Sequence, residues 1–255
     1  MTTDKVYLEK HELEHDPIIS SMSSQFMSPY SVGANVYSTV LAYRTDAFKA
    51  SHAPQSWQDF WDINRFPGRR ALRKHPFDTI EIALMADGVP PSEIYPCDLD
   101  RAFRSLDKIK PHISAWWTSD SQNTQWLRSN EIDLLQMSSN PAQEAIDAKL
   151  PVAICEEGQI VGSLDWAILK GTPKADLCRQ FIKFASDPKR QVLLSAHSGF
   201  VGLTHPDAFK HIDPERVKLI PTYLDNLKKV CTTDVAYWFK NQNAVIERFN
   251  NWVIS

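Results

Sequence analysis

Asp78 and Glu81 are the acidic residues whose spacing is most informative. Asp78 precedes an apolar run that ends at Met85, and Glu81 follows Asp78 by three residues. In a capping box the first side chain accepts a hydrogen bond from the first turn of a helix, and an acid or amide stands three residues later. A carboxylate at a helix start can equally bind an ammonium group through a charge-assisted hydrogen bond. The spacing therefore predicts a helix from Asp78 and leaves two roles open for its side chain, helix cap or ligand contact.

Other polar side chains lack the pattern of a catalytic or metal centre. His11 and His15 are four residues apart, so they can share a helix face and bind a metal, but a solvated polar stretch is the favoured interpretation. Glu156 and Glu157, or Asp165 with His75, could serve as acid and base in an α/β enzyme, but no nucleophile motif accompanies them. Neither a dinucleotide-binding glycine pattern nor a phosphate-binding P-loop occurs in the sequence. We therefore predict no enzyme, no cofactor and no metal.

Basic and aromatic clusters have structural alternatives. Five basic residues between positions 65 and 74 could form a phosphate or nucleic-acid patch: Arg65, Arg69, Arg70, Arg73 and Lys74. The apolar residues among them favour instead a turn and a strand with a solvated outer face. Trp116 and Trp117 are neighbours at a strand end and point to opposite faces. One of them is expected in the core, and the other is a possible cleft wall.

Composition excludes several classes of protein. The 255 residues carry 28 Lys+Arg and 31 Asp+Glu, and this net charge of −3 gives no reason to expect nucleic acid or an anionic membrane surface. Eight Trp and twelve Phe are too many for a disordered chain. The four Cys residues form no C-x-x-C pair and are expected to be ordinary, mostly buried thiols. No membrane span and no secretory signal is evident, so the chain as written would remain in the cytosol.

Strands and helices alternate along the chain, which predicts an α/β fold with largely parallel pairing. The expected strands cover residues 35–43, 70–73, 113–117, 132–137, 151–155 and 165–169. The expected helices cover residues 55–62, 78–85, 100–110, 125–129, 174–185, 188–197 and 236–253, with a further one starting at Asn140 and Pro141.

Six segments taken together resemble the solute-binding proteins of ABC transporters, in the spermidine/putrescine-binding-like group. They are PYSVGANVYSTVLAYRTDAF (29–48), SWQDFWDINRFPGRRAL (56–72), DTIEIALMADGV (78–89), YPCDLDRAFRSLDKIKPHI (95–113), WWTSDSQNTQWLRSNEIDLL (116–135) and SLDWAILKGTPKADLCRQFIKFASDPKRQ (163–191). Each segment is weak evidence alone, and their common order makes the resemblance specific. It covers about residues 29 to 255.

The resemblance implies a periplasmic-binding-protein fold of type II, in which two lobes are joined by crossing strands and close on a ligand. It places crossovers near Tyr37–Ala42, Leu164–Trp166 and Val201–His205. Lobe one would comprise residues 1–42 and 164–205, and lobe two residues 43–163 and 206–255. The first βα units of the family's lobe one have no counterpart here, so the resemblance implies an N-terminally truncated member with an incomplete first lobe.

The resemblance also implies a function and a set of contacts. The chain would bind a small, polyamine-like ligand between the lobes without chemistry, and would deliver it to ABC permease subunits in the periplasm. The implied ligand contacts are Tyr37, Ser38, Thr39, Asp78, Ser138, Asp165 and Trp238. Asp165 is shifted by one residue from the family's carboxylate position, which is occupied by Leu164, and such a shift turns a strand side chain to the other face.

Structural roles remain open for four of these residues. Tyr37 and Trp238 fit a core, Asp78 fits a helix cap and Asp165 fits a strand edge. An alternative function is that of an interaction module, because a lobe without its first strands would expose a sheet edge and an apolar patch.

Overall fold

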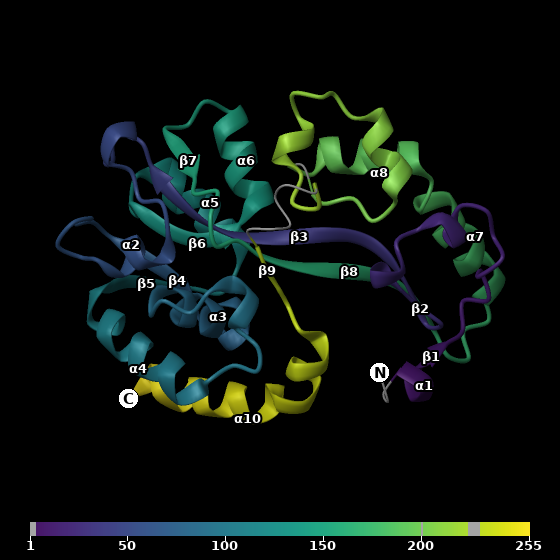
Figure 1. The fold of residues 1–255 in the computed structure, drawn as a ribbon, viewed down its shortest axis with the longest axis horizontal. Helices are drawn as coiled ribbons and strands as arrows, with labels where there is room; N and C mark the ends of the chain where they lie inside the picture. The colour runs from purple at the N-terminus through teal and green to yellow at the C-terminus, as the bar shows by residue number, and fades with distance from the viewer. Residues whose placement is uncertain (1–3, 200, 224–229) are drawn as a thin grey trace. The chain divides into compact units, whose positions relative to one another are not determined.

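A computed structural model describes residues 4–199, 201–223 and 230–255 (Figure 1). The chain forms two compact units. Unit 1 comprises Met1–Tyr37 and Gly162–Lys228, and unit 2 comprises Ser38–Val161 and Lys229–Ser255. Two long strands, β3 (Ser31–Arg44) and β8 (Ile160–Leu169), contain the points at which the chain passes from one unit to the other.

The sheet of unit 2 is mixed. Its strands β4 (Arg70–Arg73), β5 (Ile113–Trp117) and β6 (Leu134–Ser138) are parallel, with β4 in the middle. The second half of β3 runs antiparallel to β6 and to β7 (Val152–Ile154). Strand β9 (Cys231–Thr232) pairs in parallel with the start of β8. The prediction of largely parallel pairing is therefore wrong for β3, because this long strand runs opposite to the βα units that follow it.

Helices cover both faces of this sheet (Figure 1). On one face lie α2 (Trp57–Trp61), α3 (Pro76–Ala86), α4 (Leu99–Ile109) and α10 (Val235–Ile254), which pack on a core that includes Leu72 and Leu134. On the other face lie α5 (Asp120–Ser129) and α6 (Ser139–Asp147), which pack on Ala71 and Leu135. Successive residues of one strand thus point into different cores, as the pleat requires.

Unit 1 has smaller elements. Strand β1 (Leu8–Glu9) pairs with β8, and strand β2 (Met27–Ser28) pairs with β3. Helix α1 (Asp4–Tyr7) precedes β1, and helices α7 (Ala175–Ala185) and α8 (Pro188–His197) follow β8. Val36 bridges to Gly202, and Thr204 donates to the carbonyl of Gly33 at 2.8 Å. Residues 201–205 therefore belong to unit 1. The chain does not pass between the units at these residues, although the sequence predicted the third crossover there.

The two units differ from the predicted lobes. The passages in β3 and β8 lie after Tyr37 and after Val161, instead of after residues 42 and 163. Residues 206–223 belong to unit 1, whereas the sequence assigned them to lobe two. This segment packs on α8, where Ile220 and Ala208 form a small core with Leu203. The remaining passage between units falls at residues outside the described part of the chain.

Candidate functional site

The carboxyl ends of the three parallel strands in unit 2 bring polar side chains to one edge. Arg73 ends β4, Trp117 ends β5 and Ser138 ends β6. Thr39 on β3 lies opposite Ser138 in the antiparallel pair. Helices α3, α5 and α6 begin within three residues of these strand ends. In open α/β sheets, ligands bind at this edge, where helix N-termini and loop side chains converge.

The start of α3 has an unusual backbone. The N-cap is His75, whose Nδ1 accepts from the N–H of Phe77 at 3.2 Å. Phe77 has an extended ψ of 133°, and Asp78 has a left-handed φ of 66°. The predicted capping box of Asp78 and Glu81 is wrong, because their carboxylates accept hydrogen bonds from the side chains of other elements instead of from backbone N–H groups of the first turn. The kink directs the Asp78 side chain inward, and 4% of the residue is exposed.

Asp78 forms the centre of a small polar group. Its Oδ2 accepts a hydrogen bond from Thr39 Oγ1 at 2.9 Å and lies 3.6 Å from Arg73 Nη1. Burial raises the pKa of Asp78, while the Thr39 hydrogen bond and the Arg73 charge lower it. Asp78 is thus already engaged by a hydroxyl and a guanidinium from its own unit.

Arg73 is the accessible member of this group. Its side chain is 35% exposed, and its Cζ lies 5.5 Å from the centre of the Trp117 ring. Its backbone N–H donates to Gln136 Oε1 at 2.9 Å, and Thr79 Oγ1 donates to the same oxygen at 3.3 Å. A guanidinium held between a carboxylate and an aromatic face keeps further N–H groups for a planar anion such as a carboxylate.

Glu81 lies one turn below Asp78 in a second buried group. Its Oε1 accepts from Trp238 Nε1 at 2.7 Å and from the Tyr95 hydroxyl, and its Oε2 has no hydrogen-bond partner among the described residues. Burial, and next the Asp78 charge, raise the pKa of Glu81 to about 7. The ring of Trp238 packs on Phe77, with ring centroids 4.3 Å apart, so the two groups are in contact through the start of α3.

We expect Glu81 to make stability fall between mildly acidic and neutral pH. Its pKa is about 7 in the folded protein and 4.5 as a free side chain, so the folded state retains a proton that the unfolded chain releases. This contribution is fully present below pH 4.5 and is lost as the pH rises to about 7. Urea unfolding at a series of pH values checks this: Glu81→Gln should have a shallower decline than the wild type. The exposed Glu93→Gln is the control, and an unchanged slope in Glu81→Gln contradicts the assignment.

The structure brings three of the seven predicted ligand contacts to the strand edge. Thr39 and Asp78 are bonded to each other, and Ser138 donates to Asp120 Oδ1 at 3.2 Å at the start of α5. Ser38 points away from Thr39 and donates to Gln159 Oε1 at 2.7 Å. Trp238 is 5% exposed and belongs to the core, as the structural alternative held.

Two predicted contacts lie in unit 1. Tyr37 is half-buried, and its ring lies against Gly162, where an added Cβ would be 2.5 Å from the tyrosine hydroxyl. Asp165 is exposed and accepts from Ser31 Oγ at 3.1 Å. Their roles as ligand contacts remain predictions.

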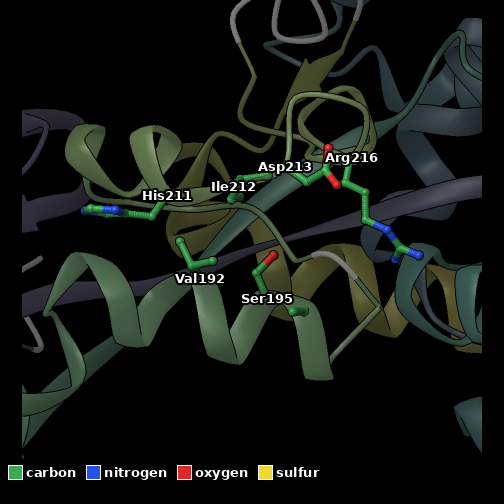
Figure 2. Close-up of a pocket in the computed structure, with 7 residues that line it drawn as sticks. Val192, Ser195, His211, Ile212, Asp213 and Arg216 are labelled. Atoms are coloured by element: carbon green, nitrogen blue, oxygen red, sulfur yellow. The ribbon is translucent and has the colours of Figure 1, made fainter.

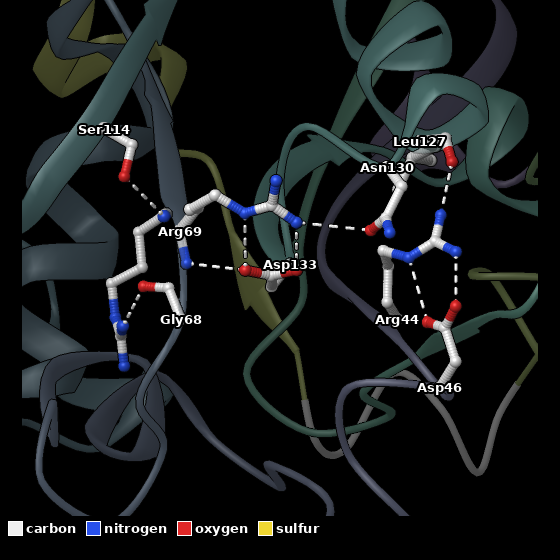
Figure 3. Close-up of polar contacts among 9 residues, drawn as sticks. Arg44, Asp46, Gly68, Arg69, Ser114, Leu127, Asn130 and Asp133 are labelled. Carbon is white, nitrogen blue, oxygen red and sulfur yellow. Dashed lines mark hydrogen bonds and ion pairs between the residues drawn. The ribbon is translucent and has the colours of Figure 1, made fainter.

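The basic cluster contains Arg73, the site residue that sequence analysis missed. Arg70 is 1% exposed, so the predicted solvated face is wrong at this position. Arg69 instead forms a two-pronged pair with Asp133, at 2.9 and 2.7 Å (Figure 3). Arg73 lies at the strand edge, because it is the last residue of β4. The sequence signal for Arg73 was its position as the last residue of a predicted strand, because the carboxyl end of that strand faces the start of the next helix.

The remaining sequence candidates have structural roles. His11 is buried, its Nε2 lies 2.8 Å from the Ser28 carbonyl, and its Nδ1 accepts from the N–H of Leu13. Residues 11–15 spell H-E-x-x-H, but they are not helical, so they cannot present both rings on one helix face. No cluster of metal ligands occurs among the described residues. Trp117 is core and Trp116 packs on Phe249 and Trp252.

The enzyme alternative and the cysteines can also be placed. Glu156 and Glu157 are exposed in the loop before β8, and His75 caps α3. Cys97, Cys155 and Cys231 are buried and Cys178 is partly buried, which confirms the prediction of mostly buried thiols. No helix in the described ranges is long and apolar enough to cross a membrane.

Unit 1 contains a separate open cavity of about 270 Å³ beside α8 (Figure 2). Its lining is Val192, Ser195, Ala196, His211, Ile212, Asp213 and Arg216. Ser195 directs its hydroxyl to the Val201 carbonyl at 2.7 Å, so this polar atom is already satisfied. None of the predicted ligand contacts lines this cavity.

Comparisons with known proteins identify relatives of the whole chain. Residues 4–216 match the family model described as bacterial extracellular solute-binding protein. The γ-aminobutyric acid (GABA)-binding protein of Pseudomonas aeruginosa is 34% identical over 246 residues, which cover 93% of this chain and 69% of that protein. An ABC transporter substrate-binding protein from Bradyrhizobium japonicum is 38% identical with a TM-score of 0.93, over 98% of this chain and 78% of that one. The Atu4243 GABA receptor is 29% identical with a TM-score of 0.86, and the match covers 99% of this chain and 77% of that one. The predicted α/β fold of a periplasmic binding protein is confirmed by these structures.

Proposed function

The chain belongs to the family of bacterial extracellular solute-binding proteins, as the substrate-binding component of an ABC transporter, and we propose that its substrate is a small zwitterionic amino acid of the GABA type. Two relatives are named for GABA, and their identities of 34% and 29% extend over nearly the whole chain. This similarity supports the ligand class, and the chemistry of the strand edge supports it independently.

The half-exposed guanidinium of Arg73 is the observation that carries the proposal. Asp78 and Trp117 hold it at the carboxyl end of β4, where it receives the carboxylate of the ligand. Asp120 is an exposed carboxylate at the same edge, next to Ser138, and it is suited to the ligand's ammonium group. A ligand with both charges matches this edge.

A polyamine, the ligand implied by the resemblance, matches this edge less well. A dication would approach the Arg73 guanidinium, and like charges at short distance repel. Asp78, the carboxylate expected to bind the cation, is buried and already bonded to Thr39. We therefore rank the amino acid above the polyamine.

The proposal places the chain outside the cytoplasm, because the family is extracellular. Its partners are the permease subunits of the transporter, and its role is binding and delivery without chemistry. This location takes precedence over the cytosolic one that the N-terminal residues suggested.

Calorimetric titration tests the ligand class. We expect GABA to bind, whereas butyrate and butylamine, which each lack one of its two charges, should bind about 10- to 150-fold more weakly, the cost of one lost charged hydrogen bond. Putrescine and spermidine should give weaker binding than GABA. Tighter binding of putrescine than of GABA would overturn the amino-acid proposal, and absence of heat with all five compounds would do the same.

A further inference from the structure

Two ionisable side chains hold the first turn of α3 from different sides. His75 accepts the N–H of Phe77 through Nδ1 at 3.2 Å, and the two rings meet edge to face with centroids 4.7 Å apart. The ring of Trp238 packs on Phe77 at 4.3 Å and donates its Nε1–H to Glu81. Both His75 and Glu81 therefore act on Phe77, the residue that precedes the left-handed Asp78.

His75 can make its hydrogen bond only as a neutral imidazole. A neutral ring has one nitrogen that accepts, whereas both nitrogens of the imidazolium donate. Protonation of Nδ1 would set two N–H groups against each other and break the cap of α3. Burial, and next the Arg73 charge, lower the pKa of His75 below its usual 6.5, so the cap persists into mildly acidic solution.

Glu81 fits its surroundings only as a neutral carboxyl group. The residue is fully buried, and its Oε2 has no hydrogen-bond partner among the described residues. Loss of its proton, at a pH of about 7, would leave two buried carboxylates one helical turn apart, those of Glu81 and Asp78. The turn must then open, or Asp78 must take up the remaining proton. Either change removes the negative partner of Arg73.

Other ionisable groups in the described part of the chain keep their charge state in this pH range. Burial raises the pKa of the four that face Glu81, namely Tyr95, Cys97, Cys231 and Tyr237. Arg73 faces His75 and Asp78 and remains a cation. Charged groups of α2, α4 and α10 pair elsewhere: Asp59 with Arg65, Arg101 and Lys108 with Asp87, and Arg248 with Asp100.

We propose that His75 and Glu81 are positioning residues, which hold Asp78 and Arg73 in their binding geometry only while both side chains are uncharged. This inference rests on the proposed function, because Arg73 is assigned to the ligand carboxylate. The affinity for GABA should then have a maximum in mildly acidic solution, between the two titrations, and should fall on both sides of it.

Calorimetric titration with GABA between about pH 5 and pH 9 tests this profile, because neither charged group of GABA titrates there. One linked proton changes the affinity by up to about tenfold per pH unit, so we expect a fall of at least about fivefold toward pH 9 and at least about threefold toward pH 5. Glu81→Gln, which is neutral at every pH, should lose the alkaline fall. His75→Asn, whose amide oxygen can accept the same N–H throughout, should lose the acidic fall.

Two matched variants separate this effect from a general response to pH. Glu93→Gln and His15→Asn remove the same ionisable groups from exposed positions outside the strand edge, and both should keep the wild-type profile. A purely structural role of His75 or Glu81 would change the affinity by the same factor at every pH.

Nuclear magnetic resonance of the ligand-free protein gives a second readout. The backbone amide signals of Phe77 and Asp78 should shift with pH in two steps, and His75→Asn should remove the acidic step and Glu81→Gln the alkaline step. Signals that do not titrate, or a GABA affinity that is constant between pH 5 and pH 9, would overturn the proposal.

Two further results are also decisive. Affinity that rises toward pH 5 would show that the His75 charge acts on the ligand directly, and this contradicts its positioning role. Absence of GABA binding at every pH would reject the proposed function, and the amide signals of Phe77 and Asp78 would then decide the inference alone.

Discussion

Replacing Arg73 with glutamine should weaken the binding of GABA by about 10- to 150-fold, because a charged hydrogen bond to the ligand carboxylate is lost. Asp78 lies 3.6 Å from Arg73 Nη1 and orients it, so Asp78→Asn should weaken GABA binding less than Arg73→Gln does. Calorimetric titration of each variant with GABA measures both effects.

The sign of the Arg73 effect distinguishes the two ligand classes. With a polyamine, removal of the guanidinium should strengthen binding, because one repulsion disappears, and Asp78→Asn should abolish it. Arg65→Gln is the matched control, since it removes the same charge from a side chain that is 60% exposed and lies outside the strand edge. Wild-type affinity for GABA in Arg73→Gln would contradict the role of this residue.

Replacing Arg70 with methionine should destabilise the protein by about 3 to 5 kcal/mol, the other large effect that we expect. The buried guanidinium donates from Nε to the Phe60 carbonyl at 2.8 Å, from Nη1 to the Gly68 carbonyl at 2.7 Å and from Nη2 to the Phe66 carbonyl. Methionine fills much of the same volume but leaves these backbone acceptors without their donor.

Urea unfolding at constant pH measures this loss. Arg69→Met is the control from the neighbouring position, where the side chain is 47% exposed and pairs with Asp133 (Figure 3). A surface pair of this kind contributes about 1 kcal/mol or less. Equal destabilisation by the two substitutions would show that the Arg70 hydrogen bonds do not hold the turn after α2.

The sequence predicted most elements of unit 2 because their signals are local. Strands 70–73 and 113–117 of unit 2 are confirmed with the bounds expected, and so is helix 188–197 of unit 1. The start of α3 was misjudged, because a left-handed Asp78 depends on the Thr39 and Arg73 side chains that fix it, and these come from different strands. The antiparallel course of β3 likewise depends on long-range pairing with β6 and β7. The burial of Arg70 depends on how the preceding turn directs its carbonyls, which hydrophobic periodicity does not report either.

The candidate site was predictable in part. Thr39, Asp78 and Ser138 were named from the resemblance, and they meet at one strand edge. Arg73 was hidden among basic residues, and its neighbours at positions 69 and 70 proved to be structural. Residues of the same charge in one short segment thus serve different purposes, according to which way each side chain points from the strand.

The positive φ of Asp78 restricts how this site can change by mutation. A φ of 66° admits glycine, asparagine and aspartate readily and most other residues at a cost. Of these three, aspartate alone carries a charge to oppose Arg73. A single exchange to asparagine therefore alters the charge of the site while the backbone keeps its shape, and the return exchange restores it. A change of ligand preference along this route needs no compensating substitution elsewhere in the fold.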